Sequence, residues 1–260
     1  MRTGILLLLL LICGNKGHGI DLALNTSALQ NASSGLILFT ESPSGTSLNP
    51  AYLSQGLETG VTHLFGLSDL PLYTFHAAIQ KKNWGFYLGG CHLSHPFYRE
   101  STLNISLSYQ LESISIGSSC RVLYSSVPLY TSSFVPVMDT GFILNYENLK
   151  SGFTIRNLSR TRFQGYLLPV VFIWETNYDF SENTSLSFGI EKERDYDFSL
   201  KICSYYRFHP YLALVSSYQY DPERFGAGII LLPESLKITY SILTHRILNS
   251  THFLSVTYGF

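Results

Sequence analysis

Charged residues are scarce in this 260-residue sequence. Lys, Arg, Asp and Glu together make up 13% of it, and the net charge is −1, whereas soluble domains carry roughly 25% charged residues. No run of Lys and Arg is present. Because a nucleic acid requires a concentrated basic surface, we expect no nucleic-acid partner. The composition suits a surface that faces lipid, and equally a tyrosine-rich secreted β-sandwich.

Cysteine is also rare. Behind the N-terminal region stand Cys91, Cys120 and Cys203, which are odd in number, far apart and without metal-ligand spacing. Neither a disulfide framework nor a zinc site is therefore predicted, and we expect free thiols on the strands. His92 and His95 lie in one expected loop, but two ligands three residues apart often arise by chance. We predict no metal and no cofactor.

Catalytic motifs are missing as well. The sequence contains no Gly-x-Ser-x-Gly elbow, no phosphate loop and no Asp/His constellation that would place a nucleophile beside a base. We therefore predict no catalytic residue and expect the protein not to be an enzyme.

No hydrophobic run is long enough to span a bilayer as a helix, which takes about 20 apolar residues. The N-terminus carries Arg2, then the apolar run Ile5 to Ile12, then Gly17-His18-Gly19 with two small residues at a spacing that signal peptidase accepts. These features predict a signal peptide over residues 1–19 and export of the remaining chain.

From about residue 57 onward, apolar and polar residues alternate with period two, which is typical of strands with two different faces. In the tail, Leu254, Val256, Tyr258 and Phe260 share an apolar face, and small polar residues lie opposite. Such runs begin near residues 58, 71, 83, 101, 113, 134, 151, 167, 184, 196, 210, 223, 235 and 250, which gives about fourteen strands.

The connections between these runs differ between the two ends of the strands. Those at one end are minimal, as at Lys81-Lys82, Glu112-Ser113 and Pro233-Glu234, and those at the other end are longer, as at residues 92–100, 125–133 and 159–165. An even strand number with this asymmetry is typical of outer-membrane barrels. Aromatic residues at strand ends, such as Tyr206, Tyr220 and Tyr258, would form the girdles at the lipid headgroups.

The sequence thus predicts an all-β protein, a single antiparallel transmembrane β-barrel over residues 58–260. A soluble secreted β-sandwich is the alternative fold, because it also alternates, and several Asn-x-Ser/Thr triplets would suit a glycosylated one. In the barrel, the polar face would line the lumen, where residues of both charge signs form ion pairs that stiffen the wall. The lumen candidates are His76, Arg121, Arg156, Glu191, Lys201 and Lys237.

Residues 20–57 precede the first strand and are rich in Ser, Asn and Gly. They contain Ser33-Ser34-Gly35-Leu36 and, closer to the first strand, Asn49-Pro50-Ala51. This segment resembles the N-terminal signature of the FadL and PorV-like outer-membrane barrels, although the small-residue pattern of those families is degraded here. The resemblance implies that the segment folds into the lumen as a plug, with Asn49, Pro50 and Ala51 inside and Asn49 bonded to the wall.

The resemblance also implies a function. In FadL-type channels a kink in the third strand opens the wall laterally, and Gly89-Gly90 falls in the third strand here. These glycines could instead only make room for the plug or for neighbouring aromatics. We expect uptake or binding of a small hydrophobic compound. The alternative is a PorV-like accessory barrel whose partner is an exported protein or a secretion complex.

The expected location is the outer membrane of a bacterial cell, reached by signal-peptide-directed export. The terminal Phe260, on the face of Leu254, Val256 and Tyr258, resembles the C-terminal signal that the barrel-insertion machinery reads. That machinery and outer-membrane lipid are therefore the expected partners.

Overall fold

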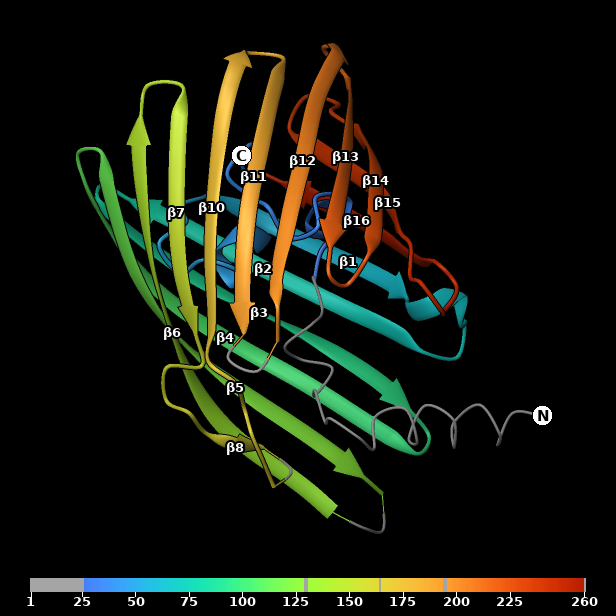
Figure 1. Cartoon of the computed structure of the whole chain (residues 1–260). Coiled ribbons are helices and arrows are strands. Elements are labelled where there is room, and N and C mark those ends of the chain that lie inside the picture. The colour runs from blue at the N-terminus through green and yellow to red at the C-terminus, as the bar shows by residue number, and fades with distance from the viewer. Residues whose placement is uncertain (1–25, 129–130, 164, 194–195, 260) are drawn as a thin grey trace.

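A closed antiparallel barrel of fourteen strands forms the computed structural model, which describes residues 26–128, 131–163, 165–193 and 196–259 (Figure 1). The signal peptide predicted at 1–19, residues 20–25 and Phe260 lie outside the described residues. The strands of the barrel are β1 (Gly56–His63), β2 (Pro71–Lys81), β3 (Trp84–His95), β4 (Tyr98–Leu111), β5 (Ile114–Val127), β6 (Thr131–Tyr146), β7 (Leu149–Arg156), β10 (Val171–Ser181), β11 (Thr184–Glu193), β12 (Phe198–His209), β13 (Leu212–Tyr220), β14 (Arg224–Leu231), β15 (Leu236–Leu243) and β16 (Thr251–Tyr258).

Pairing of the first strand with the last closes the sheet. Leu57 of β1 lies opposite Tyr258 of β16, and the register continues to His63 opposite His252. Every other strand pairs with its neighbours along the chain, except that β7 pairs with β10 across the small hairpin of β8 (Arg162–Phe163) and β9 (Tyr166–Leu167). The all-β barrel prediction is confirmed, and the β-sandwich alternative is wrong because one sheet closes on itself.

The predicted strand starts agree with the structure to within a few residues. The largest difference is at 167, which belongs to β9, so that β10 begins at Val171. The prediction of a long loop over residues 92–100 is wrong, because β3 continues to His95 and β4 starts at Tyr98. The alternation in β3 to β6 continues beyond the length that crosses a membrane, and these strands extend past their neighbours as long hairpins.

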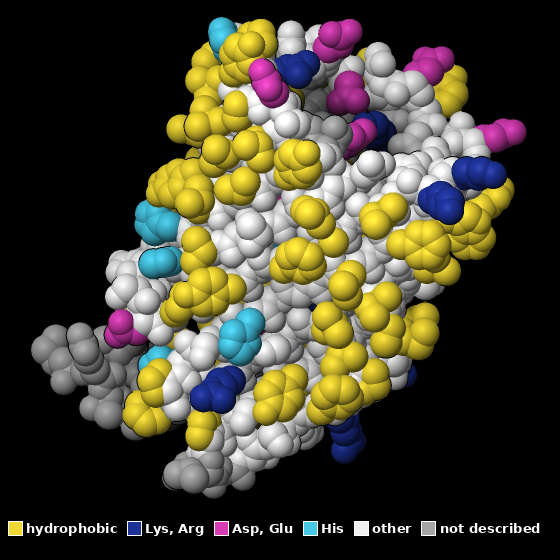
Figure 2. All heavy atoms as spheres, turned by 180° about the vertical axis from the view of Figure 1, so that it is seen from behind, with side chains coloured by type: hydrophobic (Ala, Val, Ile, Leu, Met, Phe, Trp, Pro, Cys, Tyr) yellow, Lys and Arg dark blue, Asp and Glu magenta, His cyan; other side chains and the backbone are white. Residues whose placement is uncertain are grey.

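The two faces of the wall have opposite character. On β5 the side chains of Ser115, Ser119 and Arg121 are buried toward the lumen, whereas Ile116 and Cys120 point outward and are exposed. Figure 2 shows hydrophobic side chains spread over the outer wall, with most charged side chains near its ends. A polar interior with an apolar exterior reverses the order of a soluble protein and is the arrangement of a barrel whose outer wall faces lipid.

Exposed aromatic side chains gather at the end of the barrel that carries the shortest hairpins. They come from both sides of those turns and are Trp84, Tyr146, Tyr178, Phe180, Tyr206, Phe208, Tyr211 and Tyr258. An aromatic girdle of this kind marks the level of the lipid headgroups. Tyr205 differs from its neighbour Tyr206, because it points inward and its ring lies 5.6 Å from the ring of Phe39.

Residues 26–55, here called the lumenal segment, lie inside the barrel (Figure 1). They form the helix α2 (Ala28–Ala32), whose N-cap Ser27 accepts the N–H of Gln30, and the 3₁₀ helix η2 (Pro43–Ser47), which begins at a proline. Among the described residues, no helix has the length and apolar character that crossing a membrane takes.

An apolar cluster fixes the first half of the lumenal segment against the wall. Leu29, Ala32, Leu36 and Phe39 pack on inward-facing side chains of β12, β13 and β14, which are Cys203, Ala213, Val215 and Ile230. Burial of one leucine side chain is worth roughly 1.5–3 kcal/mol. This apolar patch on an otherwise polar inner wall therefore gives the segment a defined position.

Candidate functional site

A carboxylate of the wall holds the middle of the lumenal segment. Glu175 of β10 is buried, and its Oε1 accepts the backbone N–H groups of Ile37 and Leu38 at 2.6 and 2.8 Å. One carboxyl oxygen thus accepts two neighbouring backbone N–H groups at short distances. Glu175 therefore fixes the backbone of the segment at the point where it crosses the lumen.

Two further charged groups fix the part that follows. Glu58 of β1 accepts the hydroxyl of Ser42 at 2.5 Å and the N–H of Ser44 at 3.3 Å. Lys237 of β15 donates to the carbonyl of Glu41 at 2.5 Å. Glu58 was not among the predicted lumen residues, although it alternates with Leu57 and Thr59 and so falls on the inner face.

Tyr52 closes this part of the segment on itself. Its hydroxyl donates to the carbonyl of Thr40 and accepts the N–H of Ser42. Burial raises the pKa of the Tyr52 phenol above its usual value of 10. The phenol therefore stays protonated and remains a donor over the physiological pH range.

The Asn49-Pro50-Ala51 motif sits on glycines of the wall. Asn49 Oδ1 accepts the N–H of Ala51 at 3.0 Å, which makes a tight turn. A Cβ on Gly141 of β6 would lie 1.9 Å from Asn49 Oδ1, and one on Gly117 of β5 would lie 2.2 Å from the carbonyl oxygen of Pro50. Gly117 and Gly141 are direct partners across the two strands. Because neither has a side chain, the turn can lie directly against the backbone of the wall.

Gly89 and Gly90, the predicted lateral opening, lie in a fully paired part of the wall. They pair with His76 and Phe75 of β2 on one side and with Asn104 and Leu103 of β4 on the other, with no shift of register. Room for Tyr87 explains Gly89, because a Cβ there would lie 2.1 Å from the Tyr87 hydroxyl. In this structure the wall is closed at the two glycines.

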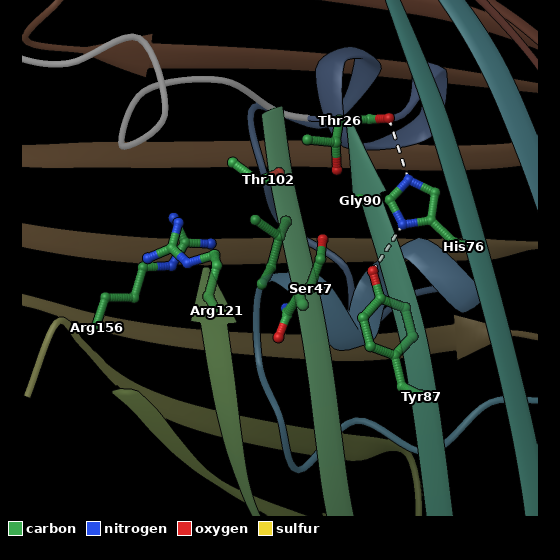
Figure 3. Close-up of a pocket in the computed structure, with 10 residues that line it drawn as sticks. Thr26, Ser47, His76, Tyr87, Gly90, Thr102, Arg121 and Arg156 are labelled. Carbon is green, nitrogen blue, oxygen red and sulfur yellow. Dashed lines mark hydrogen bonds between the residues drawn. The ribbon is translucent and has the colours of Figure 1, made fainter. Parts of the chain in front are cut away.

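The hydroxyl of Tyr87 lies 2.7 Å from Nδ1 of His76, whose Nε2 lies 3.3 Å from the carbonyl oxygen of Thr26 (Figure 3). His76 is thus a buried link between the wall and the start of the lumenal segment.

The remaining predicted lumen residues form the expected ion pairs in part. Lys201 of β12 contacts Glu191 of β11 at 2.7 Å. Arg121 of β5 lies 3.4 Å from Asp139 of β6, measured from Nε to Oδ2. Asp139 was not predicted as a partner. It is a single carboxylate among the apolar and small polar residues of β6, and its position in the sequence does not show that it faces Arg121.

A cavity of about 450 Å³ lies between the lumenal segment and the wall strands β7 and β10 to β14. Leu36, Ile37 and Leu48 of the segment line it, together with Ile173 of β10. Charged side chains line the rest, and these include Arg156, Glu175, Glu191, Asp197, Lys201 and Arg224. Its volume is in the range of small-molecule sites, which measure roughly 300–1,000 Å³.

A second, much smaller cavity of about 30 Å³ adjoins it. Thr26, Ser47 and Leu48 of the lumenal segment line it together with His76, Tyr87, Arg121 and Arg156. Figure 3 shows the guanidinium groups of Arg121 and Arg156 next to each other at this cavity. Arg156 and Leu48 line both cavities.

His92 and His95, considered above as a loop pair, both lie in β3 and not in a loop. Because side chains alternate along a strand, positions three apart point to opposite faces. His92 Nδ1 lies 2.8 Å from the Ser101 hydroxyl. Within the described ranges, no cluster of His, Cys, Asp and Glu suited to a metal ion is found.

The predicted insertion signal lies on the outer wall as far as the structure describes it. Leu254, Val256 and Tyr258 are exposed on the outer face of β16, and Phe260 lies outside the described residues.

No known protein family and no curated protein matches this sequence. Among solved structures, the fold is similar to that of the CymD monoaromatic hydrocarbon channel, with a TM-score of 0.68 and 10% identity over 91% of this chain and 98% of that one. The chain has the fold of a β-barrel channel. A mutant of the Rh. blastica porin is more distant, with a TM-score of 0.46 and 10% identity over 78% of this chain and 98% of that one. The resemblance to FadL and PorV-like families stays a prediction.

Proposed function

We propose that this chain is an outer-membrane channel that binds a small, largely hydrophobic compound and passes it through the barrel. The observation that carries the proposal is the 450 Å³ cavity, which the barrel encloses and which Leu36, Ile37, Leu48 and Ile173 provide with apolar walls. Charged and polar side chains line the rest of the cavity, so the apolar part of a compound would lie on these four side chains, and the polar groups would fix its orientation.

The outer wall supports a place in the membrane. Its exposed side chains are mainly large and apolar, and the aromatic girdle marks one headgroup level. In the outer membrane of a bacterium, lipid would cover this wall and the barrel-insertion machinery would have placed it there. The proposal requires no reaction on the compound.

The fold of the CymD monoaromatic hydrocarbon channel suggests the size of the compound. A single aromatic ring with a short substituent fits a cavity of about 450 Å³ with room for water. We infer that such a compound enters at the end of the barrel where Asp197, which precedes β12, and Pro222, which lies between β13 and β14, line the cavity.

Onward passage requires the lumenal segment to move, because it lies inside the barrel (Figure 1) and its residues Leu36, Ile37 and Leu48 line the cavity. The bonds from Glu175 to Ile37 and Leu38 lie directly at the cavity, so a compound resting on Ile37 would contact the part of the segment that must yield. The proposed route runs along the lumen, since the wall at Gly89 and Gly90 is paired on both sides.

A cavity-filling variant tests the proposal. In Ile173→Trp the larger side chain would occupy the cavity, and uptake of radiolabelled toluene by cells expressing the barrel is expected to fall at least fivefold. The matched control is Phe172→Trp, which changes the outward-facing neighbour on the same strand and should leave uptake unchanged. Equal uptake by Ile173→Trp and the unmodified protein, with equal amounts of barrel in the outer membrane, would contradict the proposal.

A further inference from the structure

The larger cavity borders on the apolar cluster that lies between the lumenal segment and the wall. Leu36 lines the cavity and also belongs to the cluster, which packs on β12, β13 and β14. The same cluster includes Phe39, and the partly buried side chains of Tyr205 and Leu232 pack against it. Apolar side chains therefore lead from the cavity toward the end of the barrel that is away from Asp197.

The inner faces of β12 and β13 show the same order. Lys201 and Gln219, which are direct partners across these strands, both line the cavity. The next two inward positions of β12 are Cys203 and Tyr205. Tyr205 lies opposite Val215 of β13, and all three of these side chains are in or against the cluster. Along the strands, the cluster therefore follows the cavity in the direction of the shortest hairpins.

Phe39 and Tyr205 meet where the cluster approaches this end of the barrel. Their ring centroids are 5.6 Å apart, and one ring belongs to the lumenal segment and the other to the wall. Tyr205 lies near the end of β12, which stops at His209. Leu232 follows β14 directly, and its N–H donates to the carbonyl of Tyr211 in the neighbouring hairpin connection. The two rings thus stand at the boundary between the cluster and the outside.

The contacts within the cluster differ in kind from those that hold the next part of the lumenal segment. Apolar contacts are non-directional, so an apolar compound can replace an apolar side chain without breaking a hydrogen bond. Glu58, by contrast, accepts from Ser42 and Ser44. Lys237 donates to the carbonyl of Glu41. A compound that passed there would have to break these buried bonds, so the cluster is the easier way out of the cavity for an apolar compound.

We propose that the compound leaves the cavity through the apolar cluster and that Phe39 and Tyr205 form a gate at its exit. The two rings close the exit when no compound is present, and they turn aside when a compound displaces them. This gate rests on the proposed function and deepens it, because it names the residues that limit the rate of passage after binding. Tyr205 is outside the cavity lining, so it acts on passage and not on binding.

Uptake of radiolabelled toluene by cells that express the full-length barrel tests the gate. Tyr205→Ala is expected to raise the uptake rate at least threefold, because the exit stays open. The matched control is Tyr206→Ala, which removes the outward-facing neighbour and should leave the rate unchanged. Tyr205→Phe, which keeps the ring, should also leave the rate unchanged. Heat-modifiable migration verifies that each variant has folded.

Binding separates a gate from a role in shaping the cavity. Calorimetric titration of the purified barrel in detergent with toluene should give Tyr205→Ala the affinity of the unmodified protein within twofold. A change in affinity as large as the change in uptake rate would overturn the gate, because Tyr205 would then act on binding.

A double variant tests whether the two rings act together. Phe39→Ala alone should raise the uptake rate, but in the Tyr205→Ala background it should add little, because the exit is already open. If Phe39→Ala raises the rate by the same factor in both backgrounds, the rings act separately and the paired gate is overturned.

Failure of the gate and failure of the proposed function give different results. If Tyr205→Ala and Tyr206→Ala show equal uptake while Ile173→Trp still lowers it, the gate is overturned and the proposed function remains. If the purified barrel shows no saturable toluene binding and Ile173→Trp leaves uptake unchanged, the proposed function fails, and the gate fails with it.

Discussion

The inner and outer faces of the same strands follow different rules. On β12, Leu200 and Ile202 point outward and are exposed. Lys201 and Cys203 point inward, where Lys201 contacts Glu191 and Cys203 packs in the apolar cluster with the lumenal segment. At the outer positions the residue only has to be large and apolar. At the inner positions the residue has to match a particular partner in the lumen or on a neighbouring strand.

This difference teaches where specificity lies in the molecule. A lipid-facing position accepts many apolar side chains, because lipid adapts to their shape. An inner position such as Glu175 or Gly141 is matched to one backbone group of the lumenal segment, so its replacement acts on the segment and on the cavities beside it.

The largest effect is expected from a charge on the outer wall. Ile202→Lys near the middle of β12 would place an ammonium group against hydrocarbon, which costs about 2–4 kcal/mol. Ser199→Lys on the inner face of the same strand, which lines the larger cavity, should cost less than about 1 kcal/mol because the group stays hydrated and near carboxylates. Urea unfolding in lipid vesicles measures both. Equal losses would mean that the outer wall of β12 does not face lipid.

A smaller effect is expected at the glycines under the Asn49-Pro50-Ala51 turn. Gly141→Ala would press a methyl group on Asn49, and overpacking of this kind costs about 1–3 kcal/mol. Gly152→Ala is the matched control, because its Cβ would lie 3.2 Å or more from Asn49 and Leu38. Limited proteolysis should cut the lumenal segment faster in Gly141→Ala only. Unchanged cleavage in both variants would show that the turn does not depend on Gly141.

The smallest effect is expected from Glu175→Gln. Both N–H groups bond to one carboxyl oxygen, which the amide oxygen can replace, but an amide is a weaker acceptor than a carboxylate, so the change costs about 1 kcal/mol. Hydrogen exchange at the amides of Ile37 and Leu38 should become about fivefold faster. Phe172→Leu, an outward-facing change on the same strand, is the control. Exchange that stays as slow as in the unmodified protein would remove Glu175 as an anchor of the segment.

Much of the wall could be predicted from the sequence because one physical rule determines it. Alternation of Leu103, Ile105 and Leu107 with Asn104, Ser106 and Ser108 sets the faces of β4 without reference to any other part of the chain. The strand number follows from counting such runs. The sequence did not show where the hairpins of β3 to β6 end, because alternation continues unchanged beyond the level of the membrane.

The site could be predicted only in part. The alternation of inward and outward positions along the strands predicts six residues on the inner face, and the structure has them there. They are His76, Arg121, Arg156, Glu191, Lys201 and Lys237. That Arg121 and Arg156 meet depends on the curvature that brings β5 and β7 around one lumen. The partners of Glu175 are backbone groups of Ile37 and Leu38, and no side-chain pattern identifies those. Gly89 likewise leaves room for the side chain of Tyr87, and the sequence does not show that the Tyr87 hydroxyl lies against this position.

In the proposed function, the cavity between the lumenal segment and the wall holds a small, largely hydrophobic compound. A crystal of the full-length barrel soaked with iodobenzene, measured for the anomalous signal of iodine, tests this directly. We expect an iodine peak in the cavity lined by Leu36, Ile37 and Ile173, and we expect it to disappear in Ile173→Trp. Iodine peaks confined to the outer wall, with none in the cavity, would contradict it.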